Sequence, residues 1–256
     1  MVLTACGSEP VAWGAIARSA GSDAAGADWR ITLDDGARAS LAPALAVPFT
    51  PPAGACPGSL VFARSGGGGE WYAAWWQPRA GGASLLVSRS ANDGGSWTPP
   101  STADARDRSG PGCDRPRPAI AADSAGGYVH LAYFLRPSDG AGVWFTHSMD
   151  QGKTWHAPVG IFYGDAPARV SVAAEGDTVV VAYEYPMARD PRIGVALSHS
   201  AGHIFDARVQ ASGENEAARD PRVAIHGRTV AVAWRPGALD DTIPRGEIAL
   251  RVGTLP

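Results

Sequence analysis

The sequence has almost no lysine: Lys153 is the one lysine among its 22 basic residues. It also lacks a positive balance: 25 acidic residues leave a net charge of −3, whereas nucleic-acid-binding proteins usually carry a basic footprint. A hydrophobic fraction of 45% with a mean hydropathy of −0.09 excludes a multi-span membrane protein. A GC-rich genome explains the preference for arginine, but arginine also binds carboxylates in bidentate fashion, so its positions matter.

No window of the sequence has the 3.6-residue apolar period of a helix, so we expect almost no helix. Instead, β-branched or alternating runs lie between clusters of Gly, Pro and Asp, which is typical of strands. Three such runs are 71–75, 129–133 and 179–183. Each ends 15 residues before a serine, at positions 90, 148 and 198. This regular spacing indicates a repeat architecture.

Each of these serines begins a short motif with a glycine and a closing aromatic residue. The fullest copy reads SMDQGKTW at 148–155, and graded copies lie at 90–97, at 198–205 and, more degraded, at 22–29. A short polar acceptor can bond backbone N–H groups two residues on, and the glycine supplies the positive φ of a tight turn. The defining residues are Ser90, Asn92, Gly94 and Trp97; Ser148, Asp150, Gly152 and Trp155; and Ser198, Gly202 and Phe205.

This motif resembles the Asp box, or BNR repeat, Ser-x-Asp-x-Gly-x-Thr-Trp, of bacterial sialidase-like β-propellers. The resemblance extends over the repeats of nearly the whole chain but hardly to catalytic residues. It implies an all-β propeller of four-stranded antiparallel blades. It also implies that the boxes are structural and lie on the face opposite the binding site.

Three repeat units look complete, at about 57–110, 115–165 and 167–215. The C-terminal unit has three strands, and the N-terminal segment offers strands at 11–18 and 30–33. Pairing of N- and C-terminal strands would close the ring and remove exposed edges. We expect five blades, with four or six as alternatives, in one domain over 11–256 that follows a residual signal-like segment at 1–10.

The three cysteines fit export from the cytoplasm. Residues 3–8, LTACGS, resemble a bacterial lipobox whose cysteine, Cys6, is lipidated, although the usual preceding regions are missing and a chance match is the alternative. Cys56 and Cys113 each precede the inner strand of consecutive blades, so a disulfide between them is plausible in an oxidising compartment, with two buried free thiols as the alternative. We therefore expect a periplasmic or cell-surface protein, attached to the membrane only through Cys6 if at all.

An arginine recurs at the entry of three inner strands: Arg117, Arg169 and Arg222 stand 52 and 53 residues apart. Each follows an aspartate, so these arginines either converge on one carboxylate ligand or pair with Asp114, Asp165 and Asp220. Sialidases use three arginines for the carboxylate of sialic acid. Loops on the same face add further ligand-binding candidates, namely Trp76, Arg136 and Arg189.

The catalytic set of a sialidase is incomplete in this sequence. Tyr185 and Glu184 are the weak candidates for the nucleophile and its activating base, but neighbouring strand residues point to opposite faces. The cysteine spacing gives no metal pattern. His199 and His203 fall inside a turn, so we expect no metal and no cofactor.

The sequence therefore favours an envelope-exposed recognition or scaffold module that binds an acidic glycan or a protein partner, and no nucleic acid, through an arginine-rich face. An exo-sialidase-type glycoside hydrolase is the first alternative, and an assembly factor is the second. Fold resemblance alone does not decide among them.

Overall fold

The computed structural model describes residues 9–20, 29–66, 69–123, 126–187, 191–237 and 247–256. Within these residues the secondary structure consists of strands without a helix, as the absent 3.6-residue period predicts, and no bilayer-crossing helix is found in them. The strands are β1 (Ala12–Ala20), β2 (Trp29–Leu33), β3 (Ala39–Pro43), β4 (Val61–Arg64), β5 (Trp71–Arg79), β6 (Gly82–Ser90), β7 (Ser101–Asp104), β8 (Ala119–Ala122), β9 (Val129–Leu135), β10 (Gly142–Ser148), β11 (Val159–Tyr163), β12 (Val170–Glu175), β13 (Thr178–Glu184), β14 (Ile193–Ser198), β15 (Ala207–Gln210), β16 (Ala218–His226), β17 (Thr229–Pro236) and β18 (Glu247–Thr254).

The described strands form four four-stranded antiparallel sheets and one two-stranded sheet. Three of the larger sheets are consecutive in sequence, β4 to β7, β8 to β11 and β12 to β15, and they fall inside the three predicted repeat units. The fourth combines β16, β17 and β18 with β1. The predicted all-β propeller of four-stranded blades is therefore confirmed.

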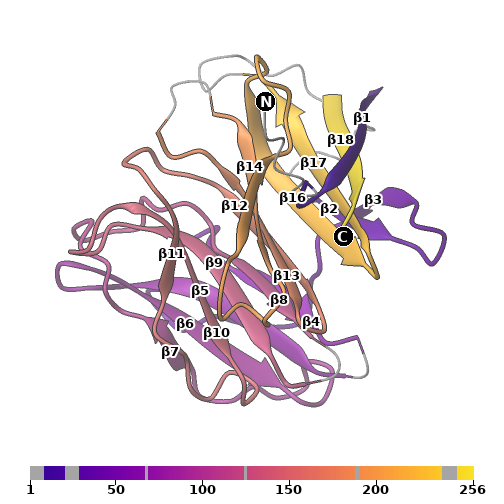
Figure 1. Ribbon diagram of the computed structural model, residues 1–256. Helices are drawn as coiled ribbons and strands as arrows, with labels where there is room; N and C mark the ends of the chain where they lie inside the picture. Colours follow the sequence, from indigo (N-terminus) through magenta and orange to yellow (C-terminus); the bar gives the residue numbers. More distant parts are fainter. Residues whose placement is uncertain (1–8, 21–28, 67–68, 124–125, 188–190, 238–246) are drawn as a thin grey trace.

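The ring is closed by strands from opposite ends of the chain. β1 pairs antiparallel with β18, with Ala12 opposite Thr254 and Ala20 opposite Glu247. In Figure 1 the indigo β1 lies beside the yellow β18. Because β1 supplies the fourth strand that the C-terminal unit lacks, this sheet has no unpaired edge at β18.

The inner strands stand side by side around the centre in the order β4, β8, β12, β16, β2. The pair β2–β3 is the smallest sheet, and the sequence did not predict β3 at all. The predicted strand at 30–33 corresponds to β2, which is an inner strand beside β16. Of the degraded motif at 22–29, only Trp29 lies in the described residues, and it begins β2.

The core lies between the sheets, and the middle strands of the second and third blades, β9, β10, β13 and β14, are almost entirely buried. Every residue of β9 and β10 is buried, as is every residue of β14. A strand covered on both faces has a nearly continuous apolar sequence rather than an alternating one. This explains why 129–133 and 179–183 are rich in apolar residues.

The three Asp boxes form equivalent turns after the third strands β6, β10 and β14. In the fullest copy, the Ser148 hydroxyl accepts the Gly152 N–H at 2.8 Å, and Asp150 Oδ1 accepts the N–H of Lys153 at 3.0 Å and of Thr154 at 2.9 Å. Gly152 has φ of 81°, the left-handed conformation that glycine adopts without strain. The boxes thus hold turns through local hydrogen bonds, as expected.

The closing aromatic residue of each box contacts a neighbouring segment. Trp155 Nε1 donates to Ser101 Oγ of β7 at 3.0 Å, which ties its box to the preceding blade. Phe205 packs edge-on against Phe145 of β10 with ring centroids 4.9 Å apart. Trp97 Nε1 donates to the Pro48 carbonyl at 3.1 Å. The boxes therefore fix the blades to one another as well as closing their own turns.

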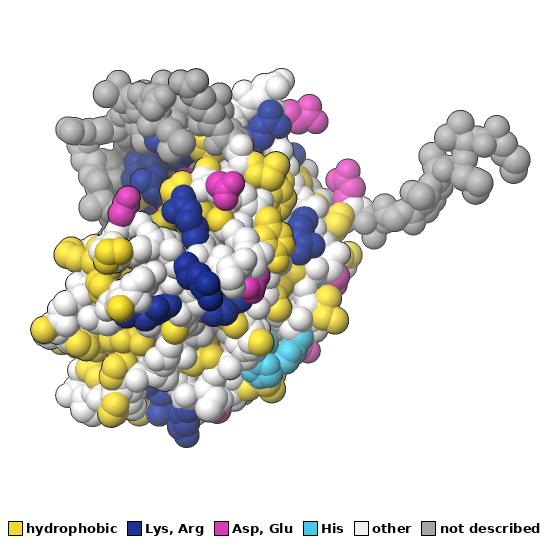
Figure 2. All heavy atoms as spheres, turned by 90° about the vertical axis from the view of Figure 1, so that its left-hand side faces the viewer, with side chains coloured by type: hydrophobic (Ala, Val, Ile, Leu, Met, Phe, Trp, Pro, Cys, Tyr) yellow, Lys and Arg dark blue, Asp and Glu magenta, His cyan; other side chains and the backbone are white. Residues whose placement is uncertain are grey.

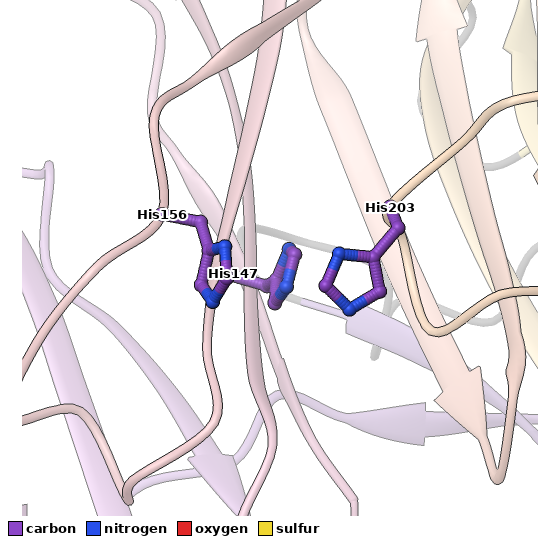
Figure 3. Close-up of side chains that lie close together, drawn as sticks. All are labelled: His147, His156 and His203. Carbon is purple, nitrogen blue, oxygen red and sulfur yellow. The ribbon is translucent and has the colours of Figure 1, made fainter.

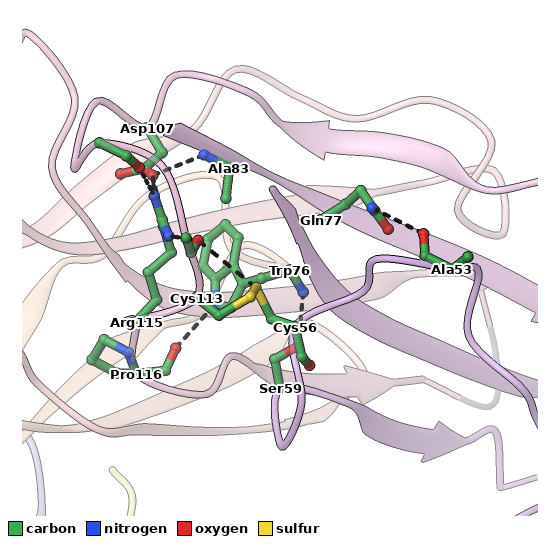
Figure 4. The surroundings of a disulfide bond; sticks show 12 residues. Ala53, Cys56, Ser59, Trp76, Gln77, Ala83, Asp107, Cys113, Arg115 and Pro116 are labelled. Atoms are coloured by element: carbon green, nitrogen blue, oxygen red, sulfur yellow. Dashed lines mark hydrogen bonds and ion pairs between the residues drawn. A yellow bond between two sulfur atoms is a disulfide. The ribbon is translucent and has the colours of Figure 1, made fainter. Parts of the chain in front are cut away.

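A disulfide joins Cys56 to Cys113, with Cα atoms 5.2 Å apart, so the predicted pairing is confirmed (Figure 4). It links the loops that precede β4 and β8, the inner strands of two consecutive blades. Beside it, Arg115 forms a buried ion pair with Asp107, whose carboxylate also accepts the Ala83 N–H at 3.0 Å. Cys6 lies outside the described residues.

Candidate functional site

The inner strands surround a central pocket of about 570 Å³. Its walls come from all five sheets, because each inner strand or the residues just before it contribute side chains. The lining residues are Trp29, Arg30, Ile31, Ala44, Leu45, Val61, Phe62, Arg117, Pro118, Ala119, Ile120, Arg169, Val170, Ser171, Val172, Asp220, Arg222, Val223 and Arg235. The three arginines at the strand entries thus line one pocket.

The pocket is strongly positive although the chain as a whole is not. Five arginines line it against one aspartate, a formal charge of +4, whereas the chain carries −3. Sequence reasoning found three of these arginines through their regular spacing. It did not include Arg30, on β2, or Arg235, on β17, among the ligand-binding candidates. Concentrated positive charge in a concave site raises the local concentration of anions.

Asp220 organises the half of the pocket near β2 and β16. Its carboxylate lies 2.7 Å from Arg222 Nη1 and 3.4 Å from Arg235 Nε, and it accepts the Trp29 indole N–H at 3.3 Å. Burial alone would raise the pKa of Asp220, but Arg222 and the other nearby arginines outweigh burial and lower it. Asp220 therefore stays ionised and holds two guanidinium groups beside the Trp29 ring.

The backbone at Asp220 explains how this side chain is directed. The pairing of β16 with β17 shifts register between Arg219 and Arg222, and Asp220 has a positive φ of 56°. A bulge re-aims side chains, and aspartate tolerates the left-handed conformation better than most residues. The sequence left open whether each entry arginine pairs with its own aspartate, and the structure shows this pairing for Arg222 and Asp220.

The other two entry arginines are held differently. Arg117 donates from Nε and Nη2 to the Leu60 carbonyl, at 3.1 and 2.6 Å, which links its blade to the preceding one. The Arg169 side chain is 55% exposed, and its Nη1 lies 4.0 Å from Glu184 Oε1. Arg169 is therefore the member of the trio with a guanidinium group open to solvent.

Glu184 lies behind the pocket wall and joins two strand entries. It is 4% exposed, and its two carboxylate oxygens accept the backbone N–H of Arg169 at 2.9 Å and of Asp220 at 2.7 Å. Burial raises the pKa of Glu184 in spite of these two bonds. Because both oxygens bind backbone groups, Glu184 positions the residues that line the pocket instead of entering it.

The remaining predicted site residues that the structure describes are not in the pocket wall. Trp76 is fully buried and donates its indole N–H to the Pro116 carbonyl at 2.9 Å, so the expectation that it faces a ligand is wrong. Arg136 lies over the Phe134 ring and donates to the Asp165 carbonyl at 2.7 Å. The Tyr185 ring packs edge-on against Phe162, 4.9 Å between centroids. Arg189 lies outside the described residues.

The Asp boxes lie at the end of the blades opposite to the entry arginines. In one blade, Ser148 of β10 pairs with Val129 of β9, which pairs with Ala122 at the far end of β8 from Arg117. The pocket arginines and the boxes therefore lie on opposite faces of the propeller.

Two comparisons with solved structures show the same fold. The sialidase Hz136, described as a Hadza microbial sialidase, matches with a TM-score of 0.52 and 16% identity over 69% of this chain and 41% of its own. An ulvan lyase of polysaccharide lyase family PL25, bound to -[GlcA(1-4)Rha3S]-, matches with a TM-score of 0.50 and 14% identity over 68% of this chain and 44% of its own.

The matched regions span less than half of each of these structures. No protein-family model and no curated protein sequence matches the chain. The fold is thus a β-propeller of the kind found in sialidases and in PL25 lyases, and at such low identity the likeness concerns the fold alone.

Proposed function

We propose that this protein is an extracytoplasmic recognition module that binds an acidic glycan in its central pocket. The observation that carries the proposal is the set of five arginines around one pocket, with a single aspartate among them. Guanidinium groups suit carboxylate and sulfate groups, because they offer several N–H donors in a planar fork. The apolar wall residues would contact the sugar rings.

The matched structures support a ligand of this chemistry. One is named as a sialidase, and the other is a lyase bound to an oligosaccharide of glucuronic acid and sulfated rhamnose. The disulfide Cys56–Cys113 supports a location outside the cytoplasm, because such bonds persist mainly in oxidising compartments. A lipid anchor at Cys6 belongs to the same proposal.

We expect binding without hydrolysis. Glu184 is bonded to two backbone N–H groups, Tyr185 packs against Phe162, and neither lines the pocket. A nucleophile and its base need hydrogen-bond contact with each other and access to the substrate. If the protein is an exo-sialidase, the wild type will release the fluorophore from a fluorogenic sialoside, and this outcome would reverse the ranking of the two functions.

The decisive experiment compares Arg169→Ala with Arg64→Ala. Both side chains are about half exposed, but Arg64 pairs with Asp93 and does not line the pocket, so it is a matched control. Binding of sialyl and glucuronate oligosaccharides is measured by calorimetry, together with their methyl esters, which lack the charge. Loss of one charged hydrogen bond costs about 1.5–3 kcal/mol, so Arg169→Ala should weaken binding about 10- to 150-fold.

Two results would contradict the proposal. One is equal affinity of Arg169→Ala and Arg64→Ala for the acidic glycans. The other is equal affinity of the wild type for a glycan and its methyl ester, because a pocket that acts through guanidinium groups must discriminate between them.

A further inference from the structure

Three histidines, none of which lines the arginine pocket, meet on the box side of two neighbouring blades (Figure 3). His147 lies near the end of β10, His156 follows the box of the same blade, and His203 lies in the box of the next blade. One ring nitrogen from each lies within 4.8 Å of the others. His203 comes from another repeat unit than His147 and His156, so no short sequence spacing predicts this cluster.

His147 is the fixed member of the cluster. Its residue is 3% exposed, and its Nε2 has no hydrogen-bond partner within the described part of the chain. A neutral imidazole has a nitrogen lone pair to offer, and leaving it unpaired in the interior is unfavourable.

The other two histidines bracket His147 from the surface. The His156 ring lies nearly parallel to the His147 ring, 4.4 Å between centroids, and the His203 ring stands edge-on to it at 4.5 Å. Both are exposed, so their rings can turn about the side-chain torsions toward a common ion. Histidine side chains form one patch at the surface in Figure 2.

Backbone contacts within one blade and between two blades bring the three histidines together. The His156 N–H donates to the His147 carbonyl at 2.9 Å. In the next blade, Gly202 has φ of 88°, and a Cβ there would come within 2.5 Å of the Phe145 ring. This close approach of the box turn to β10 brings His203 beside His147.

We propose that His147, His156 and His203 form a binding site for a divalent transition-metal ion such as Zn²⁺. Imidazole suits Zn²⁺, Cu²⁺ and Ni²⁺, whereas Mg²⁺ and Ca²⁺ prefer oxygen ligands. The ion would take up the unpaired nitrogen of His147 and connect the box turns of two blades. Three protein ligands leave a fourth tetrahedral position for water or for a ligand from another molecule.

The test uses the untagged full chain with Cys6→Ser, which removes a thiol that could bind zinc elsewhere. Zinc binding is measured by competition with a chromophoric chelator, and Tm is measured with and without Zn²⁺. We expect one equivalent of zinc and a rise in Tm that neither Mg²⁺ nor Ca²⁺ produces. Because ligands that bind the folded state stabilise it, affinity and Tm should change together.

His156→Gln and His203→Gln remove exposed ligands and should leave the fold intact. Each should weaken zinc binding at least tenfold and abolish the rise in Tm. His199→Gln is the matched control: His199 lies in the same box as His203 but faces Asp206, 3.2 Å away. Absence of zinc binding by the wild type at 100-fold molar excess would overturn the proposal, and so would equal zinc affinity of all three variants.

Discussion

Replacement of Glu184 tests whether this carboxylate supports the pocket or acts in catalysis. Its two oxygens accept the backbone N–H groups of Arg169 and Asp220, at 2.9 and 2.7 Å, inside a site where Glu184 is 4% exposed. A hydrogen bond to a charged group contributes about 1.5–3 kcal/mol to stability. A buried N–H that loses its acceptor costs a similar amount.

Glu184→Gln keeps one carbonyl oxygen but directs an NH₂ donor at the other backbone donor. We therefore expect a loss of about 2–4 kcal/mol in the free energy of unfolding, and of about 3–5 kcal/mol for Glu184→Ala, because both bonds are then lost. Urea unfolding followed by tryptophan fluorescence measures both values. The midpoint should fall while the slope m stays near that of the wild type.

Glu175→Gln is the matched control. Glu175 accepts the Gly227 N–H at 3.0 Å, but its side chain is 45% exposed, so water replaces the lost contact. This variant should lose less than about 0.5 kcal/mol. If Glu184→Gln were as stable as Glu175→Gln and yet lost an enzymatic activity of the wild type, Glu184 would act in chemistry and the supporting role assigned to it would be refuted.

Three further perturbations address the fold. Replacing Cys56 and Cys113 together by Ala opens a loop with a sequence separation of 57. The chain-entropy model predicts that the free energy of unfolding falls by about 4 kcal/mol. Urea unfolding measures this change, and an unchanged urea midpoint would argue against the disulfide. Gly202→Ala should destabilise the protein by about 1–3 kcal/mol for two reasons: the new methyl group collides with the Phe145 ring, and residue 202 has a φ of 88°, which strains alanine. A Tm equal to that of the wild type would contradict this geometry. For Asp150, slight burial would raise the pKa, but hydrogen bonds from Thr154, Ser148 and Lys153 lower it to about 2, against about 3.9 in the unfolded chain. Its stabilisation is therefore present above pH 4 and is lost as the pH falls toward 2. Because the Asp150 side chain is partly exposed, water weakens its hydrogen bonds, and Asp150→Asn should remove about 1 kcal/mol of this pH-dependent stability. If the wild type and Asp150→Asn gave parallel curves of stability against pH, this role of Asp150 would be excluded.

Much of the fold follows from the sequence, because strand periods, turn residues and box motifs are local. The turn at 148–155 needs only its own serine, aspartate and glycine, and the hydrogen bonds of Ser148 and Asp150 lie within it. The repeat spacing then places equivalent residues in equivalent blades. For this reason the sequence pointed to a disulfide between Cys56 and Cys113, with two free thiols as the alternative, and identified three of the pocket arginines.

Other features depend on which strands become neighbours, and no local pattern records that. β2 packs beside β16 as an inner strand, and this position places Trp29 and Arg30 in the pocket wall. Trp76 was expected at the ligand but is core, since side chains on both faces of a middle strand are covered by adjacent sheets.

The sequence by itself determined the blade, its turns and the spacing of its entry residues, because each of these rests on interactions within a few residues. Only the tertiary structure decided which charges share a pocket, which carboxylate supports it and which histidines meet. Glu184 reaches two strand entries, and His147 and His203 come from different blades, so their roles arise from the packing of one repeat against the next.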